Sequence, residues 1–149
     1  MAALLCGCAA APLQHDQTVS LGSDQGLAAV MIDTLDPLTE VAFRQPDGGR
    51  KLVVAAVPAG INIYLFPIRA GRYCMTGFHF ANLDFKMGGA PECFQVSAGR
   101  LSYSGTLAPR VEDGRPVTHQ VMDLQGFRVL LGEQYPTIAR QFPAPPPAE

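Results

Sequence analysis

The sequence predicts a mainly β protein, an antiparallel β-sandwich of about six or seven strands with one short C-terminal helix. Short apolar or alternating runs fill most of the chain, with turn residues about every 10 residues, as is typical of sandwiches. Helical spacing of apolar residues begins only near the end. Hydrophobic residues make up 48% of the chain and charged residues 16%, which indicates a packed domain rather than a disordered one.

The first half contains four runs with the length and composition of strands. They cover residues 27–33, 38–45, 51–57 and 61–68. Asp36-Pro37, Pro46-Asp47-Gly48-Gly49 and Pro58-Ala59-Gly60 separate them, and glycine supplies the positive φ of tight turns. The run 61–68 is apolar at both alternating positions, which predicts a central strand covered on both faces.

The second half contains further strands separated by one longer loop. The strands are expected at 72–80, 93–97, 101–107 and 117–124, and the loop at 82–91. Within 101–107, apolar and polar residues alternate, which predicts a half-buried strand. Leu101, Tyr103 and Leu107 then share one face with Gly105. The other face, toward solvent, carries Ser102, Ser104 and Thr106.

The C-terminal segment changes to helical character. Phe127, Leu130 and Leu131 repeat at helical spacing, and Gly132 and Pro136 interrupt the pattern. This predicts one short helix followed by a turn. The folded domain is expected over 26–141, and the proline-rich end, 142–149, is expected to be a disordered tail.

The N-terminal residues point to export. Leu5-Cys6-Gly7-Cys8 resembles the lipobox of bacterial lipoproteins, in which the last cysteine is acylated and becomes the mature N-terminus. Only seven residues, without Lys or Arg, precede Cys8, so we interpret 1–8 as a truncated signal segment. The alternative is a disordered tail that carries two cysteines. Residues 9–25 are expected to form a flexible tether.

The resemblance implies a location in the cell envelope. Lipid on Cys8 would attach the domain to a membrane, and Ala9 after the cysteine favours the outer membrane, facing the periplasm, by the sorting rule of enteric lipoproteins. The net charge of −2 provides no basic field, so no nucleic-acid partner is expected.

Cys74 and Cys93 remain for the folded domain. In an oxidising compartment they are expected to form a disulfide, which closes a loop of about 20 residues and stabilises the domain by roughly 3 kcal/mol. The alternative is a pair of buried free thiols. Two isolated cysteines lack the paired spacing of zinc sites, so no metal site is predicted there.

Two stretches carry a further resemblance. Residues 61–75 contain a turn at Ala70-Gly71, and Phe94 to Gly105 follows an F-x-V-x-x-G-x-x-x-Y-x-G pattern. Both are similar to small bacterial lipoproteins with a transthyretin-like or carboxypeptidase-regulatory-like β-sandwich. The resemblance covers roughly residues 38–138. It implies fold and location, and it transfers no catalytic residue.

No catalytic, metal or cofactor site is predicted. The sequence contains no nucleophile elbow, zincin helix or phosphate loop, and His15, His79 and His119 are not spaced as metal ligands. Glu112-Asp113 is interpreted as exposed turn charge. Cys and Met favour soft copper, but a copper site from Cys74, Met75, His79 and Met87 is not predicted, because Cys74 and Met75 point to opposite faces of a strand.

The loop from Phe80 to Pro91 is the candidate contact surface. Phe80, Phe85, Lys86 and Met87 would form an exposed patch that meets a partner protein. The first hypothesis is therefore a lipid-anchored envelope interaction or accessory module that is not an enzyme. The alternative is a domain that binds a small molecule or glycan between the strand ends and the C-terminal helix.

Overall fold

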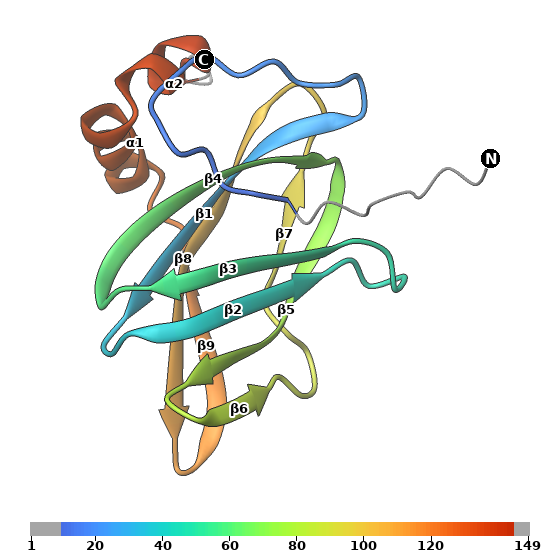
Figure 1. Cartoon of the computed structure of the whole chain (residues 1–149), viewed down its shortest axis with the longest axis vertical. Helices are drawn as coiled ribbons and strands as arrows, with labels where there is room; N and C mark the ends of the chain where they lie inside the picture. Colours follow the sequence, from blue (N-terminus) through green and yellow to red (C-terminus); the bar gives the residue numbers. More distant parts are fainter. Residues whose placement is uncertain (1–9, 145–149) are drawn as a thin grey trace, which may run out of the picture.

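The computed structural model describes residues 10–144, which form nine strands followed by two helices (Figure 1). The mainly β class predicted from the sequence is confirmed. The elements in chain order are β1 (Gln25–Thr34), β2 (Leu38–Arg44), β3 (Lys51–Val57), β4 (Gly60–Arg69), β5 (Gly71–Phe80), β6 (Leu83–Lys86), β7 (Cys93–Val96), β8 (Leu101–Glu112), β9 (Arg115–Val121), α1 (Leu124–Gln134) and α2 (Pro136–Gln141).

The strands form two sheets that pack as a sandwich, as predicted. Sheet A has the order β4-β1-β8-β9, and sheet B has the order β3-β2-β5-β6, with β7 paired to the start of β5. The strand pairs are antiparallel except β1 and β8, which run parallel. Parallel neighbours require a long connection, and here the chain from β2 to β7 supplies it.

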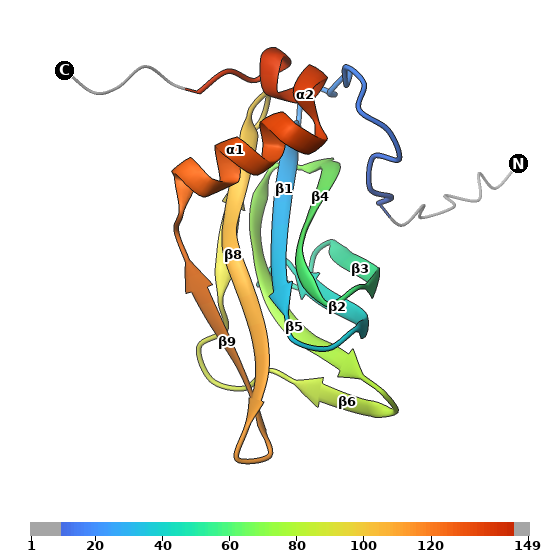
Figure 2. The same ribbon diagram turned by 90° about the vertical axis from the view of Figure 1, so that its left-hand side faces the viewer.

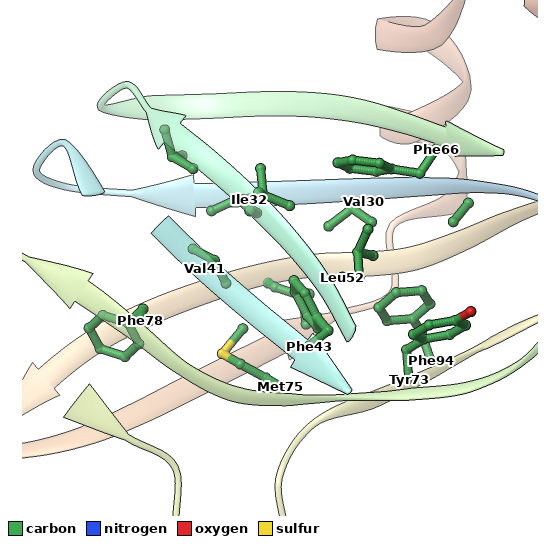
Figure 3. Packing of buried hydrophobic residues seen from close by; sticks show 14 of the residues in the cluster. Val30, Ile32, Val41, Phe43, Leu52, Phe66, Tyr73, Met75, Phe78 and Phe94 are labelled. Carbon is green, nitrogen blue, oxygen red and sulfur yellow. The ribbon is translucent and has the colours of Figure 1, made fainter. Parts of the chain in front are cut away.

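The main core fills the space between the sheets (Figure 3). Val30 and Ile32 of β1 face it from sheet A, and both are fully buried. Phe94 packs edge-on against Phe43, with ring centroids 5.5 Å apart, and is stacked on Tyr73 at 5.9 Å. Because these rings come from β2, β5 and β7, their packing fixes the short strand β7 to sheet B.

A second core lies on the opposite face of sheet A, beneath the helices (Figure 2). Leu27 and Ala29 of β1 face Phe127 and Leu131 of α1 there, and all four are buried. Tyr103 of β8 stacks on Phe127 with centroids 4.3 Å apart. The molecule therefore has three layers, and β1 is apolar at both alternating positions because both of its faces are covered.

β4 lies at the edge of sheet A, so the prediction of a central strand is wrong. Its burial on both faces is nevertheless confirmed. Phe66 and Ile68 face sheet B, whereas Ile63 and Leu65 face the helical layer. A third layer can cover an edge strand on both sides, and this covering produces the same apolar pattern as a central position.

Two short elements differ from the prediction. The expected loop 82–91 contains β6, which forms a hairpin with the end of β5 through Ala81 at φ 53°. The expected single helix is two helices, because Pro136 begins α2. Proline is favoured at the first turn of a helix, where no backbone N–H is required.

β8 contains a bulge that breaks the predicted alternation. Ala29 pairs with Tyr103, but Met31 pairs with Thr106, so two residues of β8 oppose one of β1. Leu101 and Tyr103 consequently face the helices, whereas Leu107 faces sheet B. Ser104, at the bulge, is fully buried rather than solvent-facing.

In the segment before β1, residues 13–21 pack against the helical layer, whereas Ala10 packs against the main core. Leu13, Val19 and Leu21 contact the second core. The Asp16 carboxylate accepts hydrogen bonds from the first backbone N–H groups of α2, and the Gln141 side chain bonds both backbone groups of Val19. The structure thus places this stretch, expected as a tether, against the domain. Cys8 and the segment 1–8 lie outside the described residues.

Within residues 10–144, neither helix has the length and apolar character needed to cross a bilayer.

Candidate functional site

A groove of about 700 Å³ lies between α1 and the outer face of sheet A. We call it the α1 groove. The helices cover only one end of this sheet, and the strands continue beyond them (Figure 2), so the groove forms where the cover stops. It is lined by Met31, Asp33, Ile61, Thr106, Val121, Asp123, Gln125, Gly126, Val129, Leu130 and Glu133.

The walls of the α1 groove are largely apolar and open to solvent. Ile61 of β4, Val121 of β9 and Val129 of α1 are 53%, 58% and 57% exposed. Met122, which follows β9, and Leu124, the first residue of α1, are also exposed and are neighbours in sequence of the lining residues Val121 and Asp123. These five are most of the eight large apolar side chains that are exposed among the described residues. Such a concentration marks a contact surface rather than ordinary surface scatter.

The charged groups of the α1 groove are carboxylates. Asp33, Asp123 and Glu133 line it, and none of its described lining residues is Lys or Arg. The Asp123 carboxylate caps α1 by accepting a hydrogen bond of 2.9 Å from the Gly126 N–H. Arg110 donates to the backbone oxygen of Asp33 at 2.7 Å, and its guanidinium lies 3.9 Å from the Asp33 carboxylate. The groove therefore offers negative charge beside apolar surface.

The sequence indicated this region without identifying its residues. The alternative hypothesis placed a pocket between strand ends and the C-terminal helix, and the α1 groove lies there. Val129 was the available signal, because it falls outside the helical face formed by Phe127 and Leu131. Ile61 could not be identified from the sequence. β4 is apolar at both alternating positions, so its sequence does not distinguish the residues that the helices cover from those that they leave exposed.

The predicted disulfide is confirmed. Cys74 of β5 and Cys93 of β7 are directly paired in sheet B and bonded through their sulfurs. Since Cys74 is half of this bridge, it has no thiolate to offer a metal. No group of three or more His, Cys, Asp or Glu side chains within residues 10–144 is arranged to hold a metal ion.

The residues of the predicted contact loop are brought together around β6, mostly against the main core. Phe85 of β6 stacks on Phe78 with centroids 5.4 Å apart. Phe80 and Met87 are half-buried and also pack against the core, while Lys86 is exposed. The exposed large apolar side chain of this region is Leu83, at 56%, so less apolar surface is free here than at the α1 groove.

The other candidate residues have structural partners on the surface or in the sheets. His79 Nε2 lies 2.8 Å from an Asp84 carboxylate oxygen, and His119 Nε2 lies 3.1 Å from Glu112. The buried Ser104 hydroxyl donates to the Gly105 oxygen and accepts from the Met31 N–H. None of the three candidates, His79, His119 and Ser104, lines the α1 groove.

Burial shifts the ionisation of tyrosines elsewhere in the molecule. It raises the pKa of Tyr64, of Tyr73 and of Tyr135 above the usual tyrosine value. The Tyr73 hydroxyl donates to the Arg69 carbonyl at 2.8 Å. These rings are part of the packing, and none lines the α1 groove.

Comparison of the chain with protein-family models, with curated proteins and with solved structures gives no match. The similarity to small transthyretin-like lipoproteins therefore stays a prediction from the sequence, and the α1 groove is the feature from which a function is argued.

Proposed function

We propose that this chain is a non-catalytic binding module of the bacterial cell envelope, attached to the membrane through lipid on Cys8. Its binding site is the α1 groove, and its partner is a protein segment. The observation that carries the proposal is the exposed apolar surface of Ile61, Val121 and Val129 within one groove. Covering such surface is favourable by roughly 25 cal/mol for each Å² of apolar area removed from water.

The chemistry of the groove favours a segment with apolar side chains and basic flanks. Apolar anchors would cover Val129 and the strands beneath it, and Lys or Arg would approach Asp33, Asp123 and Glu133. Complementary charge of this kind speeds association and selects among partners more than it adds affinity. We therefore expect binding to weaken as salt concentration rises.

A binding role rather than a catalytic one is supported by what the polar groups already do. Asp123 holds the start of α1, and Asp33 lies beside Arg110. Within the described part of the chain, His79 and His119 are paired with carboxylates rather than with a serine, threonine or cysteine. These contacts account for the positions of the carboxylates and histidines without a catalytic role.

Site-specific crosslinking in cells tests the groove. A photoreactive amino acid in place of Gln125, an exposed residue of the groove, is expected to give a discrete protein adduct. The matched control replaces Gln95, which is exposed on β7 in sheet B, and should give none. Val129→Asp in the Gln125 background should abolish the adduct, whereas Val111→Asp, at an exposed site on the β8–β9 hairpin, should not. An adduct that survives Val129→Asp would contradict the proposal.

The anchor is tested separately at the N-terminus. Mass spectrometry of protein extracted from membranes with detergent should find acyl groups on Cys8. Cys8→Ser should release the protein into the soluble fraction, while Cys6→Ser should leave it in the membrane. Unmodified Cys8 in the natural protein would contradict the proposed lipid anchor.

A small-molecule ligand is the second candidate, favoured by the size of the groove. About 700 Å³ lies within the range of roughly 300–1,000 Å³ that is usual for ligand pockets. Native mass spectrometry of the purified chain would then detect a retained molecule. That molecule should be lost from Val129→Asp and kept by Val111→Asp.

A further inference from the structure

Basic side chains gather at one end of the sandwich. Five of the eleven Lys and Arg residues line three adjoining hollows there, and all five are exposed. We call this surface the basic end, and it consists of Arg44, Arg50, Lys51, Arg69 and Arg72. Only Asp24 and Asp47 are acidic among the residues that line these hollows. Five positive and two negative charges leave +3 here, although the whole chain carries −2.

Two turns of the fold bring these charges together. The β2–β3 turn carries Arg50, and the β4–β5 turn lies between Arg69 and Arg72. The three arginines line one open hollow of about 640 Å³. Arg69 lies 3.9 Å from Asp24, whereas the side chains of Arg50 and Arg72 make no ion pair within residues 10–144. The hollow thus presents guanidinium groups that are available to an anion.

The described chain begins at this same end. Ala10 lines a hollow together with Arg50, Lys51 and Arg69, and it packs against the main core. Three residues later, the Leu13 N–H donates to the Leu65 oxygen at 2.8 Å. Cys8 precedes Ala10 by only two residues, a step that spans at most about 7 Å. A lipid on Cys8 would therefore bring the bilayer surface to the basic end.

We infer that the basic end is a membrane-contact surface that binds the phosphate groups of anionic phospholipids beside the anchor. The inference rests on the proposed lipid anchor only for the orientation of the domain relative to the bilayer. Guanidinium groups suit phosphate because they donate paired hydrogen bonds to its oxygens. Stable attachment to membranes commonly combines lipid with basic residues, and each Lys or Arg near an anionic surface strengthens binding about fivefold.

Contact at the basic end leaves the α1 groove open. β1 connects the two sites, because Gln25 at its start lines a hollow of the basic end and Asp33 near its other end lines the groove. The eight residue steps between them correspond to about 26 Å along the strand. The anchored domain would thus hold its groove away from the lipid headgroups, where a partner can reach it.

Vesicle co-sedimentation of the full chain with Cys8→Ser, which cannot be acylated there, tests the basic end without the anchor. The protein should bind vesicles of phosphatidylcholine mixed with phosphatidylglycerol and not vesicles of phosphatidylcholine alone. Binding should fall as salt rises. Arg50→Gln with Arg72→Gln should weaken binding about 25-fold, at about fivefold for each charge.

The matched control is Lys86→Gln with Arg115→Gln, which removes the same charge from exposed sites outside the basic end. It should bind like the parent, and thermal unfolding should show both variants folded. Equal binding to neutral vesicles, or an equal loss in the control, would overturn the inference. Competition by inorganic phosphate at constant ionic strength would also overturn it, in favour of a site for a soluble anion. Acylation of Cys8 and the Gln125 adduct test the proposed function and are measured in separate experiments. Failure of vesicle binding can therefore be distinguished from failure of the proposed function.

Discussion

Gly105 controls the geometry of β8 at the residue scale. It has φ +77° and lies in the bulge that switches Leu107 to the face opposite Tyr103. A Cβ there would lie 2.8 Å from Sδ of Met122, the end of an exposed and flexible side chain, and 3.0 Å from Cγ of Gln120. The Gln120 side chain cannot shift freely, because its amide donates to the Ser104 oxygen at 2.7 Å and to the Cys93 oxygen at 3.1 Å. Glycine is thus required both for conformation and for space.

We predict that Gly105→Ala destabilises the protein more than Gly114→Ala. Gly114 has nearly the same φ, +75°, but nothing lies within 4 Å of its Cβ position. Gly114→Ala should cost roughly 1–2 kcal/mol for the left-handed backbone alone. Gly105→Ala should cost about 1 kcal/mol more, since displacement of Gln120 weakens its hydrogen bonds. Free energies of unfolding in urea provide the comparison, and equal losses would show that Gln120 accommodates the methyl group.

At the scale of elements, the N-terminal segment and α2 stabilise each other. Asp16 supplies the side-chain cap that the residue directly before α2 does not, since Tyr135 makes no capping side-chain bond. Partial burial raises the pKa of Asp16, but hydrogen bonds from Thr137 and Ile138 and the charge of Arg140 outweigh it. The net pKa lies below the ordinary value of 3.8.

The depressed pKa predicts a pH-dependent contribution to stability. A carboxyl group whose pKa is lower in the folded state stabilises the protein above its unfolded pKa, and this contribution is lost as pH falls through the folded pKa. The Tm of wild type should therefore exceed that of Asp16→Asn at neutral pH, and the difference should shrink below about pH 4. Asp36→Asn, at an exposed position, is the charge-matched control. A constant difference down to acid pH would contradict the proposed cause.

At the scale of the whole molecule, the disulfide closes the β5–β6 hairpin and its following loop into one covalent ring. Cys74 and Cys93 are 19 residues apart in sequence. Between them lie β6 and the residues that were predicted to contact a partner. The bridge holds β7 beside β5, where Phe94 completes the aromatic packing with Phe43 and Tyr73.

Reduction should destabilise the whole domain, because the open chain gains conformational entropy when unfolded. For a ring of this size, the expected loss is about 3 kcal/mol in the chain-entropy model. Urea unfolding with and without reductant measures it as a lower midpoint. The double variant Cys74→Ala with Cys93→Ala should show no response to reductant, which excludes an effect through Cys6 or Cys8.

Local pattern was sufficient for most strands, because burial and turn chemistry leave a direct signature in the sequence. The turn at Pro46 to Gly49 and the apolar run of β4 are examples. The cysteines could be paired by elimination once export was assumed. β6 was missed because Leu83-Asp84-Phe85-Lys86 is short, is soon followed by two glycines and forms a strand only by pairing with β5.

The sequence by itself determined most of the strands, the β class and the bridge between Cys74 and Cys93, since these depend on residues close in the chain or on residue type. Only the tertiary structure decided the features that are formed by segments distant in the sequence. The parallel pairing of β1 with β8, the helical layer, the α1 groove and the basic end all join residues far apart in sequence. Their positions follow from the packing of whole layers, and no local pattern of residues records that packing.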